Sequence, residues 1–467
     1  MGRKQPNPNA PILLVRLANG ILASGVVVFW LVLPYGYHHL TATRPLENKV
    51  IWGFVTLCIL ASGLCGMALK LGGNAKVKLT LFAASAITSI YLAELGLTVV
   101  KLPTNWISLG HHEVIGDTRD KITVLNEIRG EGVQAYPSLI PDQYLPDLAQ
   151  QKQVIFPLGG ISNSTTVYCN ENGYWTIYES DEQGYNNPRH LNDKEPIEIA
   201  IIGDSFAEGA CVKVDENIAA VLRRKGYNTV SFGKGGNGPL VELATLIEYA
   251  KPIKPKIVLW LYCETNDLTW LEIEETWGFL TPYLTNEHYS QNLVFRQSEI
   301  DNVLIQYAKH QEEIFTSTHL VQAASSPAST FDFTSFVELD RIRDRLHLTL
   351  PTPIVPVPRT FKDILLKAKT IVSQWGGNMY FVYLPTIQRY QEGEERLLRD
   401  PKSREAVLTI VADLNISLID MHKEIFLKER KPKSLFSGNL VHYNAEGYRK
   451  VASALAQRIT LDHSQLR

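Results

Sequence analysis

The chain has 467 residues, of which 45% are hydrophobic and 20% charged, and its formal net charge is −2 at pH 7. This composition is typical of a folded protein, and the length exceeds that of one ordinary domain. The first 101 residues contain nine Lys and Arg but two acidic residues, so the remainder is net acidic. Because nucleic-acid binding normally needs a clustered positive field, we expect no nucleic-acid partner.

Three long apolar stretches occupy residues 1–101, at 17–37, 50–69 and 79–100, and Glu94 is the only charged residue within them. Each has about the length that crosses a hydrocarbon core, so we predict a membrane anchor of three transmembrane helices. A cleaved signal peptide and buried helices of a soluble protein are the alternatives. The long uncharged runs and the lack of a small-x-small cleavage site favour membrane helices.

Basic residues flank these stretches unevenly. Arg3, Lys4 and Arg16 precede the first stretch, and Lys70, Lys76 and Lys78 lie between the second and third. The loop between the first and second stretches contains Arg44 and Lys49 together with Glu47. By the positive-inside rule, this distribution predicts a cytoplasmic N-terminus. After three crossings, everything beyond residue 101 would lie outside the cytoplasm. We therefore predict a multi-pass cell-membrane protein in contact with the lipid bilayer, with a periplasmic or extracellular C-terminal domain.

Residues 102–196 are rich in Gly, Asn, Asp and Pro, which predicts a connector and a loop-rich lead-in segment. Within it, residues 173–188 indicate short strands with turns that pack against the following sheet or close one side of a cleft. Cys58 and Cys65 lie in the second apolar stretch, and only Cys169, Cys211 and Cys263 lie beyond. We interpret these cysteines as isolated thiols rather than a disulfide framework.

From residue 197 to the C-terminus, strand and helix patterns alternate. The predicted strands are 197–202, 229–232, 256–262, 379–384 and 416–419, and the predicted helices are 217–225, 241–250, 361–374, 404–414 and 445–458. Such alternation predicts an α/β fold with a parallel sheet covered by helices on both faces, and a site at the carboxyl ends of the strands. Residues 269–359 interrupt the pattern, and we interpret them as an insertion that caps the site.

Four short motifs occur at corresponding places in this pattern. GDSFAEG (203–209) follows the first strand, GKGGNGP (233–239) the second and ETND (264–267) the third, while NLVHYNAEG (439–447) precedes the last helix. Each motif alone has a local explanation as a turn or a helix cap. Together they resemble the four sequence blocks of the SGNH/GDSL hydrolases, and the resemblance covers about residue 197 to the C-terminus without the insertion.

The resemblance implies a flavodoxin-like three-layer α/β/α domain and a set of functional residues. Ser205 would be the nucleophile and His442 the base that accepts its proton. The backbone N–H groups of Ser205 and Gly236, with the side-chain amide of Asn266, would form the oxyanion hole. Gly235 competes with Gly236 for this role, because the motif contains both in succession.

The sequence departs from the family pattern at two positions. Glu264 stands where the third block usually has glycine, and Asn439 stands where the last block has an aspartate three residues before the histidine. An amide can orient the imidazole ring but supplies no charge, and the equivalent change in a serine protease lowers turnover by about 10⁴. This leaves a Ser-His pair aided by Asn439 or a carbonyl, a substitute carboxylate, or a weak or inactive catalyst. Asp420 is a candidate carboxylate by placement, although a turn role suits it equally.

The resemblance predicts an extracytoplasmic serine esterase or O-acyltransferase that acts on an acyl ester. We expect this ester to belong to a surface or secreted glycan, with lipid and peptidoglycan esters as the alternatives. The alternative is an inactive binding component of a membrane polysaccharide-assembly system, with other assembly proteins as partners. No cofactor and no metal are indicated. The histidine pairs at 38–39 and 111–112 are adjacent rather than three or four residues apart, and the glycine clusters lack the Lys-Ser or Lys-Thr of a Walker loop.

Overall fold

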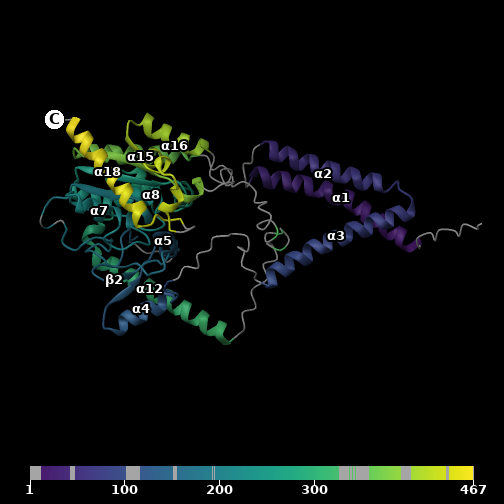
Figure 1. Ribbon diagram of the computed structural model, residues 1–467, viewed down its shortest axis with the longest axis horizontal. Helices are drawn as coiled ribbons and strands as arrows, with labels where there is room; N and C mark the ends of the chain where they lie inside the picture. The colour runs from purple at the N-terminus through teal and green to yellow at the C-terminus, as the bar shows by residue number, and fades with distance from the viewer. Residues whose placement is uncertain are drawn as a thin grey trace, which may run out of the picture. The chain divides into compact units, whose positions relative to one another are not determined.

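The computed structural model describes residues 12–42, 48–100, 116–150, 155–191, 193, 195–324, 336, 339, 342, 357–390, 401–437 and 441–465. The chain divides into two compact units. The helical unit comprises Met1–His111 and Pro327–Ile354, and the sheet unit comprises His112–Ser326 and Val355–Arg467 (Figure 1).

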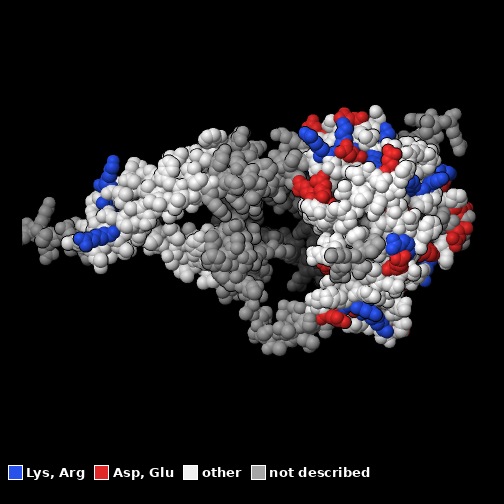
Figure 2. Space-filling model, turned by 180° about the vertical axis from the view of Figure 1, so that it is seen from behind, with Lys and Arg blue, Asp and Glu red and all other residues white. Residues whose placement is uncertain are grey.

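Three apolar helices form the helical unit: α1 (Ile12–Ala42), α2 (Asn48–Ala68) and α3 (Gly73–Val100). Helix α1 packs against both α2 and α3. Large apolar side chains remain exposed on each of them, including Leu13 (76%), Trp52 (67%) and Phe82 (74%). In Figure 2 the surface of these helices is white except for Lys and Arg side chains at one end. An apolar surface of this extent is typical of a membrane or protein contact rather than of a surface in water.

Two of the three predicted membrane spans have the required length among the described residues. Ile12–Pro34 and Gly73–Gly96 are long and apolar enough to cross a membrane, and α2 contributes a shorter apolar stretch, Val55–Ala68. The prediction of three spans is therefore corrected to two helices of full membrane length within the described residues.

Part of the predicted insertion belongs to the helical unit. The ring of Phe336 lies 5.3 Å from that of Tyr91 on α3, and the backbone N–H of Ile342 donates to the Glu94 carboxylate over 2.9 Å. Glu94 is fully buried within the structure. Burying a carboxylate in an apolar helix costs free energy unless it has a partner, and this hydrogen bond supplies one. Apart from residues 336, 339 and 342, the segment 327–354 lies outside the described residues.

The sheet unit contains five parallel strands in the order β5-β4-β6-β7-β8. They are β4 (Ile199–Ile202), β5 (Thr229–Ser231), β6 (Ile257–Cys263), β7 (Asn378–Leu384) and β8 (Ser417–Asp420). Renumbered within this sheet, the order is 2-1-3-4-5, which is the flavodoxin-like order. The predicted fold class is confirmed.

Helices cover both faces of this sheet (Figure 1). One face carries α7 (Ile218–Arg224), α17 (Met421–Glu424) and α18 (Ala445–Gln465); the other carries α8 (Pro239–Thr245), its π-helical continuation η1 (Leu246–Ala250), α15 (Arg359–Gln374) and α16 (Pro401–Asp413). Successive strand residues alternate between the two cores: Ile199 and Ile201 pack toward α7 and α18, and Ala200 and Ile202 toward α8. Because both of their faces are buried, the central strands β4 and β6 are continuous apolar runs.

Further helices complete the sheet unit around this core. They are α6 (Ser205–Glu208), α9 (Lys251–Ile253), α10 (Asp267–Glu274), α11 (Thr281–Thr285), η2 (Leu293–Phe295), α12 (Gln297–Ala324), η3 (Ile387–Tyr390), η4 (Phe426–Lys428) and η5 (Pro432–Leu435). Buried Glu248 holds the first part of the insertion, accepting hydrogen bonds from the Tyr283 hydroxyl (2.7 Å) and the Leu293 N–H (2.9 Å).

The lead-in segment has regular structure of its own. It contains α4 (Lys121–Gly130), β1 (Ala135–Pro137), α5 (Pro141–Gln150), β2 (Thr165–Val167) and β3 (Ile177–Glu179). Strand β1 pairs parallel with β2, and β3 pairs antiparallel with β2, in a sheet separate from the large one. The predicted short strand with turns within 173–188 is thus part of a second, smaller sheet. The loop between β2 and β3 leads directly to the candidate site.

Candidate active site

Ser205 is the first residue of α6, immediately after the buried strand β4. Asp204 caps this helix, because its carboxylate accepts the Phe206 N–H over 2.9 Å and thereby fixes the sharp turn. Phe206 is fully buried, whereas Ser205 is only partly buried. Burial raises the pKa of Asp204 above its ordinary value, although hydrogen bonds from Asn266 and Phe206 lower it in part. The turn therefore presents the Ser205 hydroxyl at the carboxyl edge of the sheet.

His442 lies next to Ser205 although 237 positions separate them in the chain. Its Nε2 atom is 2.8 Å from the Ser205 Oγ atom. The Ser437 N–H donates to the His442 carbonyl over 2.9 Å, and the Phe206 ring lies 5.2 Å from the imidazole ring. The structure thus brings the predicted nucleophile and the predicted base within hydrogen-bond distance.

Glu171 completes the arrangement on the other side of the imidazole. Its Oε1 atom lies 2.8 Å from the His442 Nδ1 atom, and the two side chains are 23% and 17% exposed. Glu171 comes from the loop between β2 and β3, in the lead-in segment. A carboxylate on Nδ1 leaves Nε2 free to accept the hydroxyl proton and stabilises the imidazolium that forms. The sequence interpretation missed this residue.

A disulfide between Cys169 and Cys211 fastens the loop that carries Glu171 to the chain that follows the serine turn. The Asn172 side chain adds a second link, because its Nδ2 atom donates to the Cys211 carbonyl over 2.6 Å. The prediction of isolated thiols is wrong for this pair, whereas Cys263 is a free buried thiol. Such a link between positions 169 and 211 is the signal that would have placed residue 171 beside the nucleophile.

The sequence drew attention to positions 420 and 439 for the group that supports His442. Asp420 caps α17 by accepting the Lys423 N–H over 3.4 Å, and it forms an ion pair with Arg404. It therefore has the turn role that the sequence left open. Asn439 lies outside the described residues. Among the described residues, the carboxylate on His442 Nδ1 is that of Glu171.

The two adjacent glycines of the second motif, Gly235 and Gly236, differ in hydrogen bonding and in backbone conformation. The Gly235 N–H donates to the Glu208 carboxylate over 2.7 Å, so it is already engaged. Gly236 has a φ of +77°, a left-handed conformation that favours glycine. Within the described residues, the backbone N–H groups of Ser205 and Gly236 have no acceptor. This difference favours Gly236 as the oxyanion donor of the motif.

The third motif begins at the carboxyl end of β6. The Asn266 Nδ2 atom donates to the Asp204 carboxylate over 3.0 Å, which orients the amide next to the serine turn and leaves its second hydrogen for another acceptor. Glu264, which stands at the family's glycine position, is buried and paired with Arg389, whose Nε atom lies 2.9 Å from Glu264 Oε2. The departure from glycine thus has a structural role: it anchors the loop after β7.

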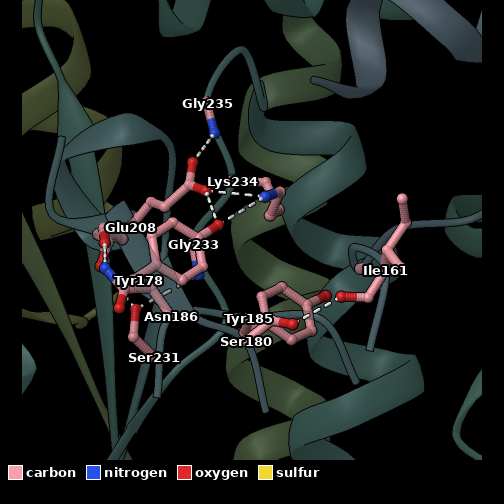
Figure 3. A network of polar contacts seen from close by, with 12 residues as sticks. Ile161, Tyr178, Ser180, Tyr185, Asn186, Glu208, Ser231, Gly233, Lys234 and Gly235 are labelled. Carbon is pink, nitrogen blue, oxygen red and sulfur yellow. Dashed lines mark hydrogen bonds and ion pairs between the residues drawn. The ribbon is translucent and has the colours of Figure 1, made fainter. Parts of the chain in front are cut away.

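A buried ion pair joins Lys234 of the glycine motif to Glu208 of α6 (Figure 3). Lys234 Nζ lies 2.7 Å from Glu208 Oε1, and both side chains are at most 2% exposed. The Tyr178 hydroxyl, from β3, donates to the same carboxylate over 2.9 Å. A Cβ atom on Gly233 would lie 2.4 Å from the Glu208 nitrogen, so only glycine permits this close approach. The network joins the serine helix, the glycine motif and the lead-in sheet.

We expect Lys234→Met to destabilise the protein by about 3–5 kcal/mol, because it leaves the buried Glu208 carboxylate without its cation. Denaturant unfolding measures this loss. The matched double variant Glu208→Gln with Lys234→Met should lose less than the sum of the two single changes, since the two groups interact directly. Strict additivity would show that the pair contributes no coupling.

We expect Asn439→Asp to change kcat by less than about threefold, which corresponds to roughly 0.7 kcal/mol. The reason is that the Nδ1 atom of His442 already has a carboxylate partner in Glu171. Steady-state hydrolysis of a chromogenic acetyl ester measures the effect. A gain of more than about tenfold would instead mean that Glu171 does not serve the base.

The amino-acid sequence matches no protein-family model and no curated protein. Among solved structures, the fold is similar to a G-D-S-L family lipolytic protein from Veillonella parvula (14% identity, TM-score 0.30, covering 56% of this chain and 98% of that one). It is also similar to a putative G-D-S-L family lipolytic protein from Desulfitobacterium hafniense (13%, TM-score 0.31, 56% and 98%) and to an acetyl xylan esterase (12%, TM-score 0.30, 56% and 100%).

The fold assignment rests on the structure of the sheet unit itself. Its strand order is the flavodoxin-like order 2-1-3-4-5, in which sites form at the carboxyl ends of the strands. The first three motifs follow β4, β5 and β6, and the fourth immediately precedes α18. The sheet unit therefore has an SGNH/GDSL hydrolase-like fold.

Proposed function

We propose that this chain is a serine ester hydrolase or O-acyltransferase that works through an acyl-enzyme on Ser205. Two contacts of His442 carry the proposal. Its Nε2 atom lies 2.8 Å from the Ser205 Oγ atom, and its Nδ1 atom lies 2.8 Å from the Glu171 Oε1 atom. A hydroxyl becomes nucleophilic when an adjacent base can take its proton, and the base works best when a third group fixes its tautomer.

In the first half-reaction, the Ser205 Oγ atom attacks the acyl carbonyl carbon while its proton moves to His442 Nε2. The tetrahedral oxyanion accepts hydrogen bonds from the Ser205 and Gly236 N–H groups and from the Asn266 amide. As the intermediate collapses, the ester C–O bond breaks and the departing alcohol takes the proton from His442. The acyl group remains bound to Ser205 as an ester.

In the second half-reaction, water or a sugar hydroxyl attacks the acyl-enzyme. His442 accepts the proton of the incoming nucleophile and returns it to the Ser205 oxygen, which restores the free enzyme. Throughout, the Glu171 carboxylate accepts a hydrogen bond from the Nδ1–H group of His442 and stabilises the positive imidazolium ring. Water gives hydrolysis and a sugar hydroxyl gives transfer, so the same residues support both reactions.

We place the sheet unit outside the cytoplasm and an acylated surface or secreted glycan in its site. The Cys169–Cys211 disulfide supports the placement, because disulfides persist in oxidising compartments. The apolar helices and the basic flanks support a membrane anchor. Reporters fused to the C-terminus test the outward placement, and a cytoplasmic signal contradicts it.

Asn439 is the feature of the sequence that favours the alternative function. In that alternative, the chain is an inactive binding component of a polysaccharide-assembly system. Glu171 occupies the face of the imidazole that the missing aspartate would contact. The absence of an acidic residue at position 439 therefore no longer argues against catalysis. We prefer the catalytic proposal for this reason.

Covalent labelling tests the proposal directly. The full-length protein in detergent is treated with a fluorophosphonate, and the modified peptide is identified by mass spectrometry. We expect the label on Ser205, together with acetate release from a chromogenic ester. Adding an oligosaccharide acceptor to the assay separates the two reactions, since an acyltransferase yields acetylated sugar at the expense of acetate. A folded protein that takes no label would contradict the proposal.

A further inference from the structure

Three different metal-binding atoms meet beside the candidate active site. One ligand atom each from Glu171, Cys211 and His442 lies within 4.8 Å of the others. Cys211 is buried, and the other two side chains are partly exposed, so an ion can reach the cluster from solvent. One sulfur, one nitrogen and one carboxylate oxygen are the ligand types of tetrahedral zinc sites, which leave the fourth position to water.

The disulfide decides whether this cluster can bind a metal. With its sulfur bonded to Cys169, Cys211 has no thiolate to offer. A dithiol reductant supplies two electrons and two protons, the S–S bond breaks into two thiols, and the reductant becomes a disulfide. The Cys211 thiol then loses its proton when a metal ion binds it.

The loop stays near the cluster through hydrogen bonds that do not depend on the disulfide. The Asn172 side chain donates to the Cys211 carbonyl (2.6 Å), and the Thr176 hydroxyl donates to the Val212 carbonyl (3.3 Å). The Thr176 N–H also donates to the Cys169 carbonyl over 2.8 Å. Breaking the S–S bond therefore leaves Glu171 and Cys211 linked through their neighbours.

We propose that the thiol form of the protein binds one Zn²⁺ ion through Cys211, His442 and Glu171, and that this ion switches the active site off. The face of His442 toward Glu171 is Nδ1. A metal ion on Nδ1 leaves the imidazole proton on Nε2, which then cannot accept the proton of Ser205. The disulfide thus keeps the site free of metal. The inhibition rests on the proposed function, whereas the binding does not.

Two variants separate the metal site from loss of the disulfide. Cys169→Ser and Cys211→Ser both abolish the disulfide, but only the first retains the Cys211 thiol. We expect calorimetric titration of the full-length protein with ZnCl₂ to give one ion per chain for Cys169→Ser, bound at least about tenfold more tightly than by Cys211→Ser or by the oxidised protein. Zn²⁺ should also abolish ester hydrolysis by Cys169→Ser, and a chelator should restore it.

Wild-type protein reduced with a phosphine provides a second measurement should Cys169→Ser fail to fold, and it should bind Zn²⁺ as that variant does. Equal zinc affinity in the two variants would overturn the proposal, as would equal affinity of the oxidised and reduced wild-type protein. Tight binding by Cys169→Ser without ester hydrolysis by any form would uphold the metal site and contradict the proposed function instead.

Discussion

Ser205→Ala is expected to lower kcat for a chromogenic acetyl ester by about 10⁶-fold, because it removes the hydroxyl that forms the proposed acyl-enzyme. His442→Ala should cost about as much, and the double variant little more, since nucleophile and base act as one unit. Steady-state kinetics measures the losses. Residual hydrolysis would come from the oxyanion donors alone.

The control for these variants is Ser437→Ala, which removes another hydroxyl near His442. The Ser437 hydroxyl is engaged elsewhere, because it donates to the Tyr443 carbonyl over 3.4 Å. We expect it to retain most of the activity. If Ser205→Ala kept more than about one hundredth of wild-type turnover while folded, the ester chemistry would have to take place elsewhere in the protein.

Glu171→Gln is expected to lower kcat by about 10⁴-fold, the loss that the corresponding acid-to-amide change causes in a serine protease. The amide keeps the size of the side chain but removes the charge that stabilises the imidazolium and selects the Nδ1–H tautomer. Glu171→Asp should recover part of the rate, because it restores the charge at a shorter reach. The same kinetic assay measures both variants.

A role for Glu171 confined to folding would give a different pattern. Glutamine would then support nearly normal turnover, and any loss would follow the fraction of folded protein. Glu179→Gln, in the neighbouring strand β3, is a suitable control because its carboxylate pairs with Arg189 rather than with His442. A loss smaller than about tenfold in Glu171→Gln would remove Glu171 from the mechanism.

The large sheet could be predicted from the sequence because its strands are buried on both faces. β6 is a seven-residue apolar run, β7 continues for six buried residues after Asn378, and the strands around them alternate regularly with helices. The strands of the small lead-in sheet have three residues each, which is too short for any periodicity to be detected. Their pairing depends on contacts between distant segments, so the sequence indicated short strands only within residues 173–188 and loops in the rest of the lead-in segment.

The residues of the candidate site also differ in how well the sequence could predict them. Ser205 and His442 stand in motifs fixed by local turns, and their placement follows from the strand order. Glu171 contacts His442 across 271 positions, and the feature of the sequence near it that bears on its place is Cys169, whose pairing with Cys211 the sequence alone did not reveal. Pattern matching directed attention to Asn439 and Asp420, which are close to His442 in sequence, whereas the carboxylate came from a distant loop fixed by a disulfide.

The segment Pro327–Ile354, which belongs to the helical unit although both of its flanks belong to the sheet unit, affects how the protein can be released from its anchor. The polypeptide passes between the units three times, near residues 111, 326 and 354. A protease that cuts once, near residue 111, would leave the sheet unit held to the helices only through noncovalent contacts of the 327–354 segment, such as those of Phe336 with Tyr91 and of Ile342 with Glu94. Release of the sheet unit therefore requires these contacts to break as well, and simple N-terminal truncation would retain a segment that has lost the helix bearing Glu94.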